Sequence, residues 1–156
     1  CVELLSRGLC HTVLMDDGSD WDSHSTTAVQ HSLNEGLFGG LNLLAEGLEA
    51  ADLLDDTVVL VVTEMTRSPR RNAYGGKDHW PTTSIFMFGG GVAGNRQLGA
   101  TDDLLEAFPV DLESGMPWSD GVLLRHDNLL AGVLEFLDID PREWLPGVTP
   151  YRGFHA

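Results

Sequence analysis

Lysine and cysteine are almost missing from this sequence of 156 residues. Lys77 is the single lysine, and 9 basic residues stand against 24 acidic ones, which gives a formal net charge of −15. Such a chain repels phosphate backbones and anionic lipid headgroups, so nucleic-acid and membrane-surface binding are disfavoured as its main function. Cys1 and Cys10 are too few for a disulfide framework and lack C-x-x-C spacing. We expect Cys10 to be buried as a small hydrophobic residue.

Several familiar motifs are also missing. No apolar stretch reaches ~18 residues, so we expect no transmembrane helix. The glycine-rich run Gly89–Gly94 matches neither nucleotide-binding motif and favours a turn, and no G-x-S-x-G supports a serine-hydrolase triad. The composition, 42% hydrophobic and 21% charged, is that of a globular domain. Because the chain starts without Met and within a helical pattern, we expect it to be the later part of a longer protein.

The apolar periodicity predicts alternating helices and strands. A run of leucines at steps of three and four predicts a long helix over 26–51, and the unbroken apolar run 57–63 is typical of a strand covered on both faces in a parallel sheet. We therefore predict an α/β sandwich in a single domain, with an irregular surface excursion over 100–121. The other predicted elements are helices 2–7 and 128–138, the latter capped by Asp127 or Asn128, and strands 9–15 and 84–88.

Carboxylates and imidazoles follow two of these strands, where ligands bind in open α/β sheets. Asp22 and His24 follow the first strand, Glu64 follows the second, and Asp78 and His79 lie further along the second loop. Each has a simpler interpretation: Asp22-x-His24 is also a helix-capping pattern, and a pair such as Asp78-His79 occurs by chance. Because a charged carboxylate at the end of a buried strand needs a partner, and because the three groups occur together, we favour a divalent-metal site. His31, seven residues after His24, fits a ligand and a helix-packing residue equally well.

Basic residues gather on the same loop. Arg67, Arg70, Arg71 and Lys77 fall within eleven positions. One interpretation is a counter-ion patch for nearby aspartates, which we favour for Arg70 and Arg71. The other, equally supported for Arg67, is that its guanidinium holds an anionic ester beside the metal.

The sequence resembles one known family at this point. Thr57–Asn72 followed by Gly75–Pro81, with Trp21-Asp22-Ser23-His24 upstream, resembles the signature of the domain-of-unknown-function 1501 family. That family belongs to the alkaline phosphatase and sulfatase superfamily, and its usual motifs are W-D-T-H and S-E-F-G-R-T-P…N…G-x-D-H-W-P. The glycine-rich run and Leu129–Pro141 also match in order. Met65 and Thr66 depart from the motif's Phe and Gly, and Asp138 replaces a glycine.

The resemblance implies a three-layer α/β/α sandwich with a mostly parallel sheet, of which this chain would be the C-terminal portion. It also implies a site for divalent ions (Zn, Mn or Ca) that acts on phosphate or sulfate esters, with Arg67 on the anion and an extracytoplasmic location. The implied metal ligands or their close neighbours are Asp22, His24, Glu64, Asp78 and His79. The superfamily's nucleophile and a further metal-binding Asp would lie upstream of Cys1.

Our first hypothesis from the sequence is therefore part of a metal-dependent hydrolase that takes a small anionic ester. The alternatives are a non-catalytic binding or envelope-associated module that keeps the fold, and phosphomutase-type transfer at the same metal site.

Overall fold

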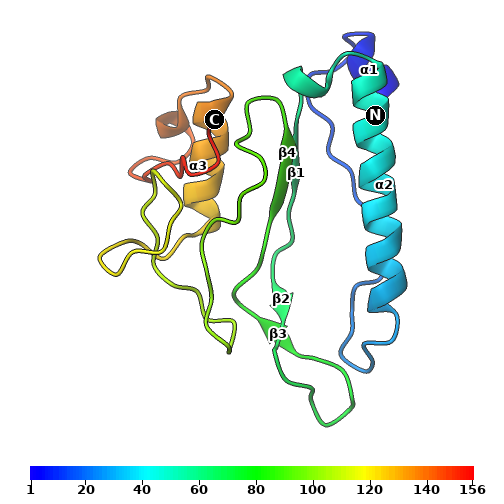
Figure 1. The fold of residues 1–156 in the computed structure, drawn as a ribbon, viewed down its shortest axis with the longest axis vertical. Coiled ribbons are helices and arrows are strands. Elements are labelled where there is room, and N and C mark those ends of the chain that lie inside the picture. Colours follow the sequence, from blue (N-terminus) through cyan, green and yellow to red (C-terminus); the bar gives the residue numbers. More distant parts are fainter. The chain divides into compact units, whose positions relative to one another are not determined.

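A computed structural model describes residues 1–156, which form two compact units, Cys1–Gly90 and Gly91–Ala156 (Figure 1). The prediction that residues 1–156 are a single domain, the C-terminal portion of a larger alkaline-phosphatase-like domain, stays a prediction. No helix is both long enough and apolar enough to cross a membrane. The first unit contains α1 (Val2–Ser6), α2 (Gln30–Ala50), the 3-10 turn η1 (Leu54–Asp56), β1 (Val58–Val61), β2 (Thr66–Arg67), β3 (His79–Trp80) and β4 (Phe86–Gly89), and the second contains α3 (His126–Phe136) and η2 (Pro141–Glu143).

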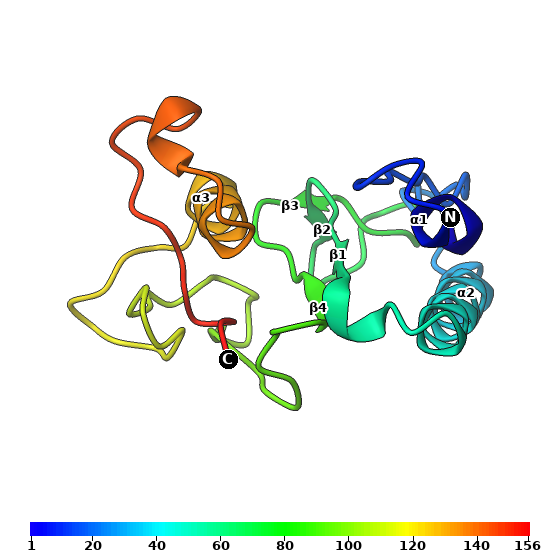
Figure 2. The same cartoon turned by 90° about the horizontal axis from the view of Figure 1, so that it is seen from above.

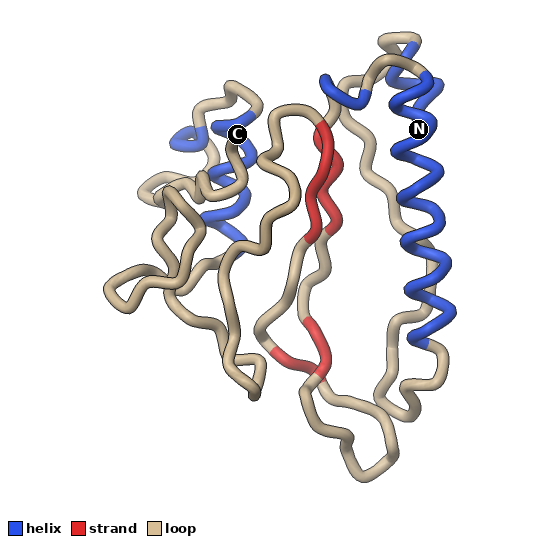
Figure 3. The backbone as a smooth tube through the Cα atoms, in the orientation of Figure 1, coloured by secondary structure: helices blue, strands red, loops and turns tan.

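The strands of the first unit build one long antiparallel arm. β1 pairs with β4, with Val58 opposite Gly89 and Val61 opposite Phe86. Further along the arm, β2 pairs with β3 as a separate two-stranded ladder. Residues 68–78 close the arm as its tip, and Figure 3 shows the two short ladders one after the other along it.

The predicted three-layer α/β/α sandwich with a mostly parallel sheet is wrong. Both sheets are two-stranded and antiparallel. A parallel pair needs a crossover connection, which is usually a helix, whereas residues 62–85 between β1 and β4 contain only β2, β3 and the tip. Strand β1 does lie inside the predicted run 57–63, but its four residues are half-buried rather than enclosed on both faces. Residues 9–15 form no strand at all, and Leu14 in that run is 97% exposed.

Helix α2 forms much as the leucine spacing predicts. Its stripe ends at Leu48, which is fully buried, and the stripe's earlier leucines are half-buried. The helix runs beside the β1–β4 ladder in both views (Figures 1 and 2), and the rings of Phe38 and Phe86 lie 6.3 Å apart. Helix α1 packs against the C-terminal end of α2, where a Cβ on Gly47 would lie 3.2 Å from the Val2 side chain. Cys10 is half-exposed, so its predicted burial is wrong.

The second unit packs around α3. Its core is formed by Val110, Leu129, Ala131, Tyr151 and Phe154. The predicted helix over 128–138 is confirmed, although it begins and ends two residues earlier. The residue at its N-cap is Arg125 and not Asp127 or Asn128 as predicted, and Asn128 Oδ1 accepts the backbone N–H of Arg125 at 3.2 Å. Residues 100–121 hold no helix or strand, as predicted. They are not only a surface excursion, because Val110 is 2% exposed.

Candidate functional site

The short β2–β3 ladder places two of the predicted site residues opposite each other. Arg67 on β2 is paired in register with His79 on β3. Directly opposed residues of an antiparallel pair project from the same face of the sheet. The Arg67 side chain is only 13% exposed. The hairpin therefore presents a guanidinium that is largely withdrawn from solvent, with an imidazole beside it.

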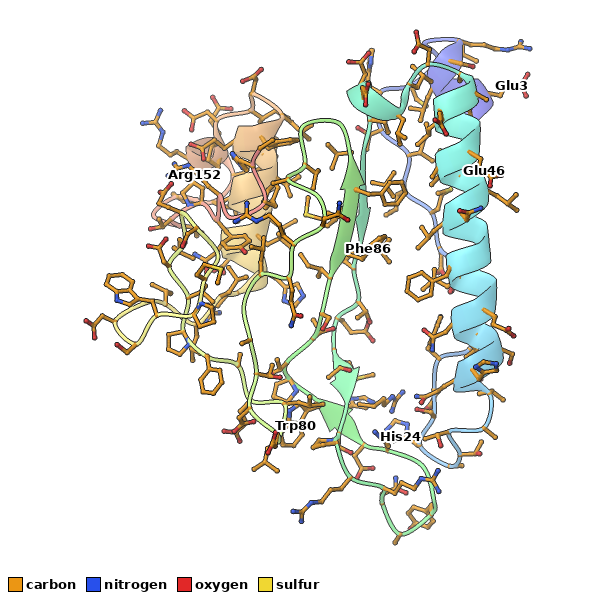
Figure 4. The ribbon with its side chains drawn as sticks, in the orientation of Figure 1. Glu3, His24, Glu46, Trp80, Phe86 and Arg152 are labelled. Atoms are coloured by element: carbon orange, nitrogen blue, oxygen red, sulfur yellow. The ribbon has the colours of Figure 1, made fainter.

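A second segment, residues 21–24 before α2, meets this guanidinium. Arg67 Nη1 lies 3.2 Å from each ring nitrogen of His24, and Nη2 donates to Asp22 Oδ1 at 3.3 Å. The His24 ring in turn lies 4.7 Å from the ring of His79, centroid to centroid. We call Asp22, His24, Arg67 and His79 the Arg67 cluster. Figure 4 shows His24 beside the β2–β3 hairpin.

Asp22 is the anion of the cluster. Its carboxylate accepts the backbone N–H of His24 at 3.1 Å and contacts Nδ1 of the His24 ring. These two bonds, and then the electrostatic interaction with His24 and Arg67, lower the pKa of the Asp22 carboxyl. Asp22 is therefore ionised at neutral pH, and the Arg67 cluster holds one carboxylate, one guanidinium and two imidazoles.

The backbone of residues 21–24 is docked onto the hairpin. Trp21 and Ser23 each offer a carbonyl, the first to Arg67 Nη2 at 3.4 Å and the second to the N–H of Lys77 at 3.0 Å. The Ser23 side chain is 1% exposed, and its hydroxyl accepts from Gln30 Nε2 at 3.0 Å. A Cβ on Gly76 would lie 2.1 Å from the His24 carbonyl oxygen, so only glycine permits this approach.

The two remaining predicted ligands lie at the margin of the cluster. The Glu64 carboxylate is exposed and accepts from Thr63 Oγ1 at 3.1 Å. The pKa of Glu64 is lowered by its own backbone N–H and by the Thr63 hydroxyl, with smaller contributions from His79 and Arg67. Asp78, also exposed, accepts from Asn72 Nδ2 at 2.9 Å. Both carboxylates are therefore near the cluster without bonding to its side chains.

Other residues singled out from the sequence lie outside the Arg67 cluster. His31 is on the surface of α2 with its side chain 87% exposed, 3.8 Å from Glu35. Arg70 and Arg71 are exposed and form no ion pair, and Arg71 donates to Thr27 Oγ1 at 3.4 Å. The counter-ion interpretation that we favoured for Arg70 and Arg71 therefore finds no partner in the structure.

The cluster contains the kinds of side chain that bind a divalent ion, but they are not arranged around one point. Imidazole nitrogens from His24 and His79 and the Asp22 carboxylate are the ligands that zinc and manganese accept. No three His, Cys, Asp or Glu side chains, however, are arranged to hold one ion. The Arg67 guanidinium lies against both ring nitrogens of His24, which places a positive charge where an ion would need those donors.

Sequence reasoning missed the residues that hold the two segments together. Ser23, Asn72 and Gly76 carry no reactive group, so a search for metal ligands and nucleophiles passes over them. A signal was present in the run Asn72-Ala-Tyr-Gly75-Gly76, because an asparagine followed by paired glycines is typical of a tight turn. In the structure, Asn72 Oδ1 accepts the N–H groups of Tyr74 at 3.0 Å and Gly76 at 3.2 Å.

Comparison with known proteins places the chain in a family. A family model described as protein of unknown function (DUF1501) matches residues 1–143, so the chain belongs to the DUF1501 family and the predicted resemblance is confirmed. No curated protein and no solved structure matches it.

Proposed function

We propose that this DUF1501 protein uses the Arg67 cluster as part of a metal-dependent site that binds and hydrolyses a small phosphate or sulfate ester. His24, His79 and Asp22 would hold the divalent ion once the Arg67 guanidinium has moved off the ring nitrogens of His24, with Glu64 and Asp78 as nearby carboxylates. When bound, such an ion polarises the ester oxygen and lowers the pKa of a bound water. An extracytoplasmic location belongs to the same proposal and comes from the family resemblance alone.

One observation carries this proposal. Side chains from residues 22–24 and 67–79, more than forty positions apart in the chain, meet around one shielded guanidinium. In a chain of net charge −15, an arginine has many acidic partners available at the surface. Arg67 is nevertheless shielded, with its side chain only 13% exposed. Its position beside the His24 imidazole and the Asp22 carboxylate, opposite His79 in the β2–β3 ladder, supports a role in anion chemistry, because guanidinium binds ester oxygens through paired donors.

The first test is calorimetry of the full chain with Mn²⁺ and Zn²⁺. We expect micromolar binding that is lost in His79→Ala and Asp22→Asn. His31→Ala is the matched control, because His31 is an exposed histidine of the same unit outside the cluster. Absence of binding, or equal binding in all three variants, would contradict the proposal.

The second test concerns the anion. With saturating Mn²⁺, inorganic phosphate and sulfate should bind to the wild-type chain and should bind at least tenfold more weakly to Arg67→Met. Arg70→Met is the control, because Arg70 is an exposed arginine three positions away with no ion pair. If both variants lose phosphate equally, general positive charge rather than Arg67 attracts the anion.

A non-catalytic binding module is the second candidate. It is favoured by the way in which Arg67 is occupied: Nη1 and Nη2 both donate to protein acceptors, including the carbonyls of Lys77 and Trp21. The two functions differ in turnover. Because the family resemblance places the nucleophile before Cys1, turnover is measured with the protein encoded by the whole reading frame. Release of p-nitrophenol from p-nitrophenyl phosphate or sulfate by that protein, lost in Asp22→Asn, supports the hydrolase, whereas phosphate binding without turnover in that protein supports the module.

A further inference from the structure

We propose that Asn72 is a positioning residue that holds the two segments of the Arg67 cluster together through its side-chain amide. This inference rests on the proposed function, because the geometry that Asn72 would hold is that of the proposed metal and ester site. Asn72 lies in the tip of the arm between β2 and β3, and it carries no group that could bind a metal strongly or act as a nucleophile.

The amide nitrogen of Asn72 makes both connections. Nδ2 donates to the backbone carbonyl of His24 at 3.0 Å and to the Asp78 carboxylate at 2.9 Å. One side chain therefore links the segment that carries His24 to the residue before His79. The partners lie 48 residues before Asn72 and 6 residues after it, so local chain geometry alone does not bring them together.

The amide oxygen of Asn72 has a different task. Oδ1 accepts the N–H groups of Tyr74 and Gly76, and the Asn72 backbone pairs with Gly76 at 2.9 Å, so this half of the residue shapes the turn. Both polar atoms of the amide are therefore used: the oxygen accepts hydrogen bonds within the turn, and the nitrogen donates hydrogen bonds to the two segments of the cluster. The split allows the two roles to be separated by substitution.

Asn72→Asp separates them. Aspartate keeps an oxygen acceptor for Tyr74 and Gly76 but removes both donor bonds, and it places a carboxylate against the His24 carbonyl and the Asp78 carboxylate. Asn72→Ala removes both halves. Asn34→Asp is the matched control, because Asn34 on α2 also donates its amide to a backbone carbonyl, that of Gln30 at 2.8 Å, and is exposed away from the cluster.

The test measures Co²⁺ binding by the visible absorption of the bound ion, together with NMR hydrogen exchange of the Lys77 amide in the metal-free chain. Residues that orient metal ligands change metal affinity by about 10–100-fold when mutated. We expect Asn72→Asp to weaken Co²⁺ by that factor, to alter its absorption spectrum, and to speed exchange at Lys77, whose N–H bonds to Ser23. Amides of α2 serve as the folding check.

Two results would overturn the inference. If Asn72→Asp matches the wild type in both measurements while Asn72→Ala does not, Asn72 shapes the turn only. If Asn72→Asp and Asn34→Asp change the Co²⁺ spectrum equally, the effect is one of charge. If the wild type binds no Co²⁺, the proposed function fails instead, and the exchange rate at Lys77 still decides whether Asn72 joins the two segments.

Discussion

Gly76→Ala tests whether the backbone contact between residues 21–24 and the hairpin tip builds the Arg67 cluster. A Cβ at position 76 would lie 2.1 Å from the His24 carbonyl oxygen and 2.2 Å from that of Ser23. Side-chain carbons are almost never closer than 3.0 Å to another heavy atom, so the opposing backbone must retreat by roughly 1 Å. Because both opposing atoms are backbone oxygens, no side-chain rotation relieves the overlap.

The expected destabilisation follows from the hydrogen bonds that this displacement of the backbone breaks. Two hydrogen bonds cross this contact, from the Lys77 N–H to Ser23 and from Asn72 Nδ2 to His24. At about 0.5–1.5 kcal/mol each, their loss is on the order of 1–3 kcal/mol. Keeping the bonds and accepting the overlap costs a similar amount, typically about 1–3 kcal/mol for an overpacked site. We therefore expect Gly76→Ala to lower the free energy of unfolding by about 1–3 kcal/mol.

The control is Gly39→Ala on α2. Nothing lies within 4 Å of a Cβ at Gly39, and alanine is favoured over glycine in a helix by up to about 1 kcal/mol. Urea unfolding followed by circular dichroism should therefore show opposite signs for the two substitutions. Mn²⁺ calorimetry should show weaker binding in Gly76→Ala alone. A Gly76→Ala chain that unfolds and binds like the wild type would refute the docking contact.

Three further predictions concern the second unit. Arg152→Met should destabilise it by about 1–2 kcal/mol in urea unfolding, because Arg152 donates to both oxygens of Glu135, at 2.5 and 2.8 Å, and the pair is only partly exposed. The hydrogen bonds from Arg152 hold the pKa of Glu135 below its ordinary value of 4.5. The stability that this pair contributes is therefore fully present above pH 4.5 and is lost as the pH falls through the lowered pKa. Acid unfolding of Arg152→Met should show a weaker dependence of the free energy of unfolding on pH. Gly132→Ala should destabilise α3 by about 1–3 kcal/mol despite alanine's helix preference, since its Cβ would lie 1.9 Å from the Tyr151 carbonyl oxygen, and thermal unfolding beside Gly39→Ala measures this.

The helices could be predicted because their signals are local. The leucine spacing of α2 and the apolar face of α3 repeat every three to four residues, and this period indicates a helix whatever the element packs against. Strand pairing could not be predicted in the same way. The run around Val58–Val61 favoured a strand, which formed, but its composition does not state which strand becomes its neighbour or in which direction.

Convergence of the site residues was predicted from an incorrect arrangement. Parallel strand ends were expected to bring Glu64 towards Asp22 and His24. The antiparallel arm instead sets Arg67 opposite His79 and leaves Glu64 exposed in the connection between β1 and β2. Residues that follow a strand lie near a turn in either arrangement, so the sequence indicated the region of the site but not which residue would be at its centre.

The contacts also show how chemistry and folding can be separated in this cluster. The hairpin binds residues 21–24 largely through backbone carbonyls, those of Trp21, Ser23 and His24, and not through the groups that would act on a ligand. Asp22→Asn and His24→Ala leave those carbonyls in place. The first replaces a carboxylate that accepts from Arg67 and from the His24 N–H by a neutral amide, and the second removes the imidazole beside Arg67. We therefore expect both variants to keep the slow Lys77 amide exchange of the wild type while they lose Mn²⁺, whereas Gly76→Ala should lose both. If Asp22→Asn speeds Lys77 exchange as much as Gly76→Ala does, the two segments are joined by the Asp22–Arg67 ion pair and not by the backbone. The loss of metal binding in Asp22→Asn would then no longer identify Asp22 as a ligand.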